Sequence, residues 1–163
     1  MSKQVDYTPE EWKTISTAPV MAGLLVSVSD LSGPIGIAKE ALAVVKAVGE
    51  STVNKSNELI KAVAEGFSAS VSASGDKPSL PSLPGDRAGI RNNLIETCKQ
   101  AAAVIAQKSP AEVEEYKRWL VSLAQRTAQA SKEGGFLGIG GILVSDAESA
   151  AVNELAAALH VGA

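Results

Sequence analysis

Hydrophobic residues recur every three or four positions along most of this chain, with polar residues between them, and that spacing predicts α-helices. The pattern is clearest in the second half, where it predicts one helix over about residues 87–108 and another over about residues 110–133. The buried seam of the later helix is expected along Val113, Tyr116, Leu120, Leu123 and Thr127. A further helical region is predicted from Pro34 to about Phe67, as one long helix or two.

Several helix starts are marked by residues that can cap a helix. Thr8 and Glu11 have the spacing of a capping box, in which each side chain accepts a hydrogen bond from the other's backbone amide. Ser145 and Glu148 repeat that spacing before the last apolar run, and Pro110 stands where proline favours the first helical position. We therefore expect helices to begin close to residues 9, 110 and 146.

Pro19 lies inside an uncharged run that covers residues 14–29. Proline lacks the amide proton that a helix interior uses, and it disfavours helical backbone at the preceding residue. We therefore predict two short helices, one before and one after Pro19. The run is shorter than the ~20 residues that a membrane-spanning helix needs, so a buried central helix is the expected role of this region.

The composition changes abruptly between residues 68 and 86, where Ser, Gly and Pro dominate. This stretch is predicted to be a long surface connection between a first helical half, about residues 8–67, and a second, about residues 87–160. Apolar positions are filled mostly by Ala and Val and only 4% of residues are aromatic, which favours close helix packing. The expected fold class is all-α, a single helical bundle of five to seven helices over residues 1–163.

The segment from Gly134 to Val144 contains five glycines and no charged residue. A phosphate-binding P-loop would need Lys and Ser or Thr after its last glycine, and a dinucleotide-binding loop would need its glycines between a strand and a helix; neither pattern is present. One interpretation is structural, with glycines allowing close backbone contact while the large side chains plug the end of the bundle. The other is an exposed apolar interface. The residues that would form this interface are Phe136, Leu137, Ile139, Ile142 and Leu143.

Charge and residue counts exclude several classes of function. The net charge is −3, with 15 basic residues scattered among 18 acidic ones, so we expect no nucleic-acid partner. One cysteine and one histidine cannot supply the ligands of a zinc, iron–sulfur or haem site. Cys98 is expected to be a packed core thiol, and His160 a solvated end or a helix-capping partner. We therefore predict no enzyme activity and no cofactor.

Two loop-then-helix stretches, residues 28–40 and residues 144–159, resemble tellurite-resistance TerB-like helical domains. The first contains Val28-Ser29-Asp30 followed by Lys39-Glu40, and the second contains Val144-Ser145-Asp146 followed by a helical run. In that family acidic loop residues bind a divalent metal. The resemblance implies the following metal-binding candidates: Asp30, Glu40, Asp146 and Glu148.

The sequence thus predicts a non-enzymatic helical-bundle protein with a structural or protein-interaction role, acting as a homo-oligomer or by docking a protein partner. Two alternatives stay open: reversible membrane association through residues 134–144, and binding of a divalent metal or small ligand. The first residues carry no secretory or lipidation signal, so we expect a cytoplasmic protein.

Overall fold

The computed structural model describes residues 3–29, 43–53, 57–73, 85–132 and 144–162. In these ranges the regular structure is entirely helical, with six α-helices and two short 3-10 helices. The elements are η1 (Gln4–Asp6), α1 (Pro9–Ser27), a helix over residues 43–50, η2 (Ser51–Val53), α3 (Glu58–Ala73), α4 (Arg87–Lys108), α5 (Pro110–Lys132) and α6 (Asp146–Ala158). The predicted all-α bundle is confirmed.

The expected caps are present at the helix starts. The Thr8 hydroxyl accepts from the Glu11 amide at 3.2 Å, and the Glu11 carboxylate accepts from the Thr8 amide at 2.7 Å. Ser145 and Glu148 form the same reciprocal pair before α6. These bonds satisfy amides that the first turn of a helix leaves without intrahelical acceptors, so the helix boundaries follow from local sequence.

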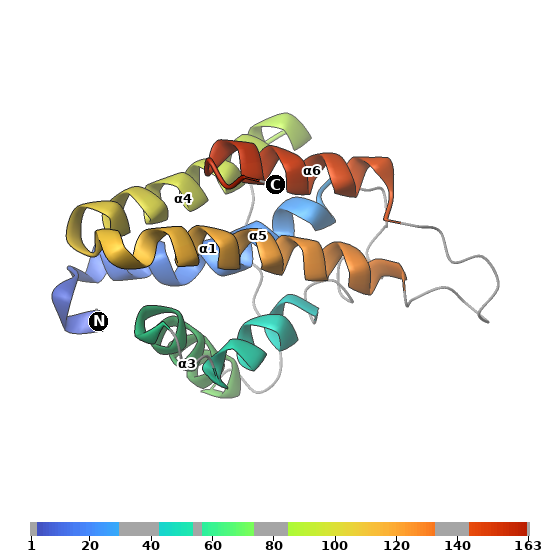
Figure 1. The fold of residues 1–163 in the computed structure, drawn as a ribbon. Helices are drawn as coiled ribbons and strands as arrows, with labels where there is room; N and C mark the ends of the chain where they lie inside the picture. The colour runs from blue at the N-terminus through green and yellow to red at the C-terminus, as the bar shows by residue number, and fades with distance from the viewer. Residues whose placement is uncertain (1–2, 30–42, 54–56, 74–84, 133–143, 163) are drawn as a thin grey trace.

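Helix α1 lies at the centre of the bundle and contacts α3, α4, α5 and α6, most extensively α4 and α5. Figure 1 shows α4 and α6 on one side of it and α3 on the other. Every residue from Met21 to Ser27 is buried, which confirms the predicted central helix. A helical segment that is apolar on all sides can be stable only when neighbouring helices surround it, and residues 21–27 of α1 are surrounded in this way. Buried apolar residues from all six α-helices form one continuous core.

The prediction of two short helices around Pro19 is wrong, because α1 runs from Pro9 to Ser27 without interruption. Pro19 cannot donate to the carbonyl of Ile15, four residues earlier. The hydroxyl of Tyr116, on α5, donates to that carbonyl instead, at 2.6 Å. Packing on several sides and this bond together compensate for the missing amide.

The structure also decides how the region from residue 34 to residue 67 divides into helices and where α3 ends. The helix over residues 43–50 and α3 are separate, with η2 after the first of them, so the region predicted as one helix or two contains two. Helix α3 continues to Ala73, and its last six residues had been expected to belong to the linker. The serines there bond within the helix, since the hydroxyls of Ser68 and Ser72 donate to carbonyls four residues earlier. The rest of that linker, up to residue 84, lies outside the described residues.

Candidate functional surface

The predicted interface residues, Phe136, Leu137, Ile139, Ile142 and Leu143, lie outside the described residues, as does most of the segment they belong to. The structure does place the two ends of that segment. Helix α5 ends at Lys132, and Val144 is half-buried against the core just before the Ser145 cap of α6. The two interpretations of the intervening side chains, inward packing and an exposed interface, both stay predictions.

Three helix ends gather at the end of the bundle from which this segment leaves. Figure 1 shows the last turns of α1 and α5 and the first turn of α6 at that end. Ser27, in the last turn of α1, is 1% exposed, and within the described residues its hydroxyl has no hydrogen-bond partner. The structure therefore places the residues on either side of the segment, Lys132 and Val144, and shows Val144 packed against the core.

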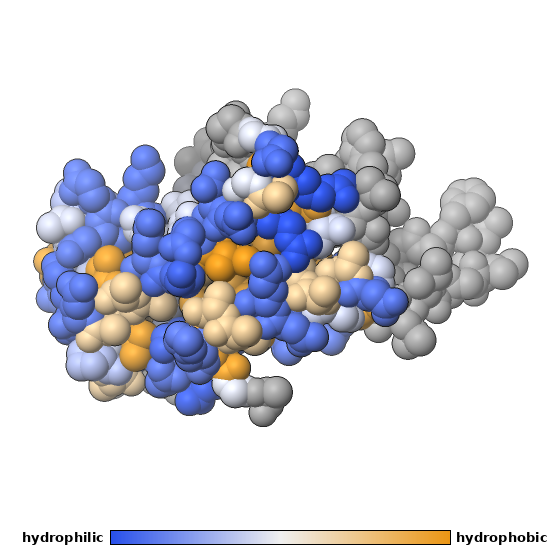
Figure 2. Space-filling model, turned by 90° about the horizontal axis from the view of Figure 1, so that it is seen from above, coloured by the Kyte–Doolittle hydropathy of each residue, from blue (hydrophilic) through white to orange (hydrophobic). Residues whose placement is uncertain are grey.

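The faces that the structure describes offer little apolar surface to a partner. Among the described residues, Val5 is the only large hydrophobic side chain classed as exposed, at 87%. Figure 2 shows one face of the molecule, on which hydrophobic areas are small and interrupted by hydrophilic side chains. Small scattered areas of this kind are normal on a monomer. The described helices also include none that is long and apolar enough to cross a membrane.

Of the four metal-binding candidates, Asp30 and Glu40 lie outside the described residues. Asp146 is exposed in the first turn of α6, where the positive end of the helix dipole stabilises a negative charge. Glu148 is 2% exposed and its carboxylate accepts from the Ser145 amide at 2.8 Å, so it serves as a cap. Within the described ranges no group of three or more His, Cys, Asp or Glu side chains could hold a metal ion.

The two residues considered for catalysis have structural roles. Cys98 is fully buried, as expected of a core thiol, and burial raises the pKa of its thiol to about 12, so it stays protonated at neutral pH. His160 is exposed directly after the C-cap of α6, which confirms the expected solvated end. A fully buried, protonated thiol is not activated as a nucleophile.

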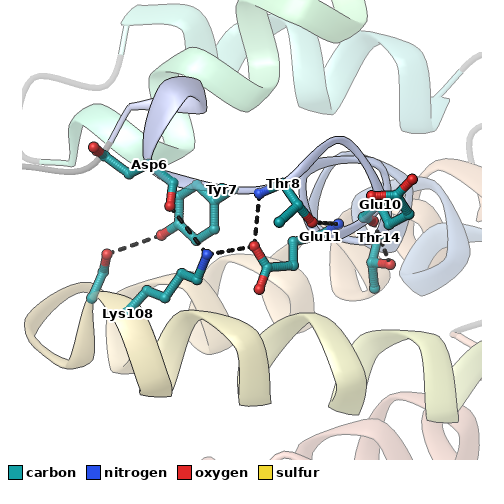
Figure 3. Close-up of polar contacts among 8 residues, drawn as sticks. Asp6, Tyr7, Thr8, Glu10, Glu11, Thr14 and Lys108 are labelled. Carbon is teal, nitrogen blue, oxygen red and sulfur yellow. Dashed lines mark hydrogen bonds and ion pairs between the residues drawn. The ribbon is translucent and has the colours of Figure 1, made fainter.

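Sequence reasoning missed a polar cluster that joins the N-terminal residues to the turn between α4 and α5. Figure 3 shows Lys108 bonded to the Glu11 carboxylate at 2.6 Å and to the Asp6 carbonyl at 3.2 Å. The hydroxyls of Tyr7 and Ser109 lie 2.9 Å apart, although the two residues are 102 positions apart in the sequence. Spacing along a chain carries no signal for such a contact.

The chemistry of this cluster is that of an anchor. The Lys108 ammonium beside Glu11 is the main cause that lowers the pKa of this carboxyl, and the Thr8 amide adds to the effect. Lys108 also lies over the Tyr7 ring, 5.6 Å from its centroid. Because these groups bond to one another, the cluster holds the first residues on the bundle, and we assign it no catalytic role.

Comparisons with protein-family models, with curated proteins and with solved structures found no match to this chain. The resemblance to TerB-like domains therefore stays a prediction, and function has to be argued from the chain itself.

Proposed function

We propose that this protein is a non-enzymatic helical-bundle protein that self-associates through residues 134–144. The observation that carries the proposal is a contrast between two parts of the molecule. The described faces expose one large hydrophobic side chain, Val5, whereas the 134–144 segment has Phe136, Leu137 and three further large apolar residues without any charge.

The size of the hydrophobic effect supports association through this segment. Burying a Leu, Ile or Phe side chain contributes about 1.5–3 kcal/mol. Five such side chains facing outward would contribute a free energy of the same order as the cost of bringing two proteins together. The segment connects α5 to the capped start of α6, so both of its ends join helices that the structure describes.

The test is the oligomeric state of the purified protein, measured by native mass spectrometry and light scattering at several concentrations. We expect a dimer or larger assembly, and we expect the double variant Leu137→Asp with Ile142→Asp to become monomeric. Val5→Asp is the matched control, because it places the same charge on an exposed apolar side chain elsewhere, and it should not change the assembly.

Circular dichroism must show that the double variant keeps its helices. A wild-type protein that stays monomeric at high micromolar concentration overturns self-association. If such a monomer captures another protein, or floats with liposomes, through aspartate-sensitive contacts, the same segment serves partner docking or membrane association instead.

A further inference from the structure

Pro19 creates a defect in the most buried helix of the molecule. In a regular helix the amide of residue 19 would bond to the carbonyl of Ile15, and proline has no amide proton to donate. Ile15 is 0% exposed, so water does not reach this carbonyl from outside the bundle. A buried carbonyl without a donor costs free energy comparable to a lost hydrogen bond.

The donor that repairs this defect comes from another helix. Tyr116, on α5, is 0% exposed, and its hydroxyl donates to the Ile15 carbonyl at 2.6 Å. The two residues are 101 positions apart. The Tyr116 hydroxyl can make this bond at only one position along the axis of α1, because a hydrogen bond weakens steeply with distance and angle.

The other buried side chains of the two helices are mostly apolar. They include Ala18, Ala22 and Leu25 on α1 and Leu120, Leu123 and Ala124 on α5. The hydrophobic effect that favours their burial is not directional, whereas a hydrogen bond needs its donor at one place. One helical turn is 5.4 Å, and of the two positions about one turn after Tyr116, Leu120 has no donor and Trp119 donates its indole N–H to the Ser51 hydroxyl at 2.8 Å.

We propose that Pro19 and Tyr116 form a register pin. The Tyr116 hydroxyl replaces the amide that Pro19 lacks, and this bond fixes the position of α5 along α1. A shift of α5 by one turn would leave the Ile15 carbonyl buried without this donor. The pin is independent of the proposed self-association, since it lies inside one copy.

The test is a double-mutant cycle of Tyr116→Phe and Pro19→Ala, measured by equilibrium unfolding. Tyr116→Phe should raise the ratio of unfolded to folded protein about tenfold or more, because it leaves the carbonyl of Ile15 without a donor. With Ala at position 19 the carbonyl has its helical donor, and the same tyrosine change should then raise that ratio less than about threefold.

Tyr7→Phe is the matched control. It removes a buried phenol hydroxyl that faces the Ser109 hydroxyl and no backbone carbonyl, so its effect should be the same with Pro or Ala at position 19. Equal effects of Tyr116→Phe in the two backgrounds would overturn the proposal.

Amide NMR spectra test the register itself. The wild-type protein and the Pro19→Ala variant keep the Tyr116 bond and should each give one set of signals. The double variant lacks the bond that sets Tyr116 of α5 against Ile15 of α1, so its α1 and α5 amides should split or broaden. A single sharp set in a stably folded double variant would show that the bond only satisfies a carbonyl, and the register pin would be rejected.

Discussion

His160 closes α6 in a backbone conformation that residues with a side chain rarely adopt. Its φ is 55°, in the left-handed region. The His160 amide donates to the Ala157 carbonyl at 3.1 Å and the Val161 amide to the Ala156 carbonyl at 2.9 Å. These two bonds define a Schellman motif, whose left-handed position is usually occupied by glycine. The strain at His160 is therefore a consequence of how the helix ends.

At the residue scale we predict that His160→Gly stabilises the protein. Glycine adopts a positive φ without steric cost, and after its larger entropy in the unfolded chain is subtracted, the expected gain is about 0.5–1 kcal/mol. Urea unfolding measures it. His160→Ala is the control, because it removes the imidazole but keeps the Cβ. An equal gain from His160→Ala would mean that the ring, and not the backbone, is the source of the strain.

At the element scale, one glycine decides how closely two helices approach. A Cβ placed on Gly23 of α1 would lie 2.1 Å from a methyl carbon of Val44, in the helix over residues 43–50. No real contact is that short, so these helices can pack as they do only because residue 23 has no side chain. Gly66 of α3 is different, since a Cβ there would meet nothing within 4 Å.

These two glycines give opposite predictions for the same substitution. Gly23→Ala should lower the free energy of unfolding by about 1–3 kcal/mol, because it overpacks the contact with Val44. Gly66→Ala should raise it by about 0.5–1 kcal/mol, because alanine is the better helix former at an open position. Chemical denaturation measures both. Adding Val44→Ala should reduce the loss of unfolding free energy that Gly23→Ala causes. If the loss is the same with Val or Ala at position 44, the close approach of these two helices is refuted.

At the scale of the whole molecule, the centre of the bundle holds two acids that stay neutral. Burial is the main cause that raises the pKa of both Cys98 and Tyr116. The pKa of the Cys98 thiol rises to about 12. Cys98 on α4 lies 3.6 Å from the Ala18 carbonyl, and Tyr116 bonds to the Ile15 carbonyl, so both groups face α1. Charging either one in the folded state would place an anion in an apolar core.

Stability should therefore fall in alkaline solution. In the unfolded chain the Cys98 thiol loses its proton near its ordinary pKa of 9.0, whereas the folded protein keeps the proton up to about pH 12. The contribution of the protonated Cys98 thiol to the free energy of unfolding is complete below pH 9. It is lost as the pH rises toward 12, at up to about 1.4 kcal/mol per pH unit. Unfolding measured from pH 7 to pH 10.5 checks this.

Cys98→Ala separates the thiol from the other groups that titrate in alkaline solution. The variant should show a shallower alkaline slope, and the remaining slope should include the share of Tyr116, which has the same sign. An unchanged slope would contradict a protonated core thiol.

The elements of this fold could be predicted from sequence wherever the cause is local. The Thr8 and Ser145 caps and the apolar seam of α5 specify helices whose starts the structure reproduces. The end of α3 could not be predicted, because serines that bond back to their own helix look the same in sequence as serines of a linker. The candidate interface was predicted from composition alone, and the structure adds where its ends are anchored.

What the sequence determined by itself is the helical class, the helix starts and the buried character of residues 14–29, since hydrophobic spacing, caps and absence of charge act over a few residues. Only the tertiary structure decided that α1 passes through Pro19, that Gly23 meets Val44 and that Lys108 holds the N-terminus. Each of these depends on a group far away in the chain. The local rule at Pro19 failed for this reason: the missing donor was supplied by Tyr116, from another helix.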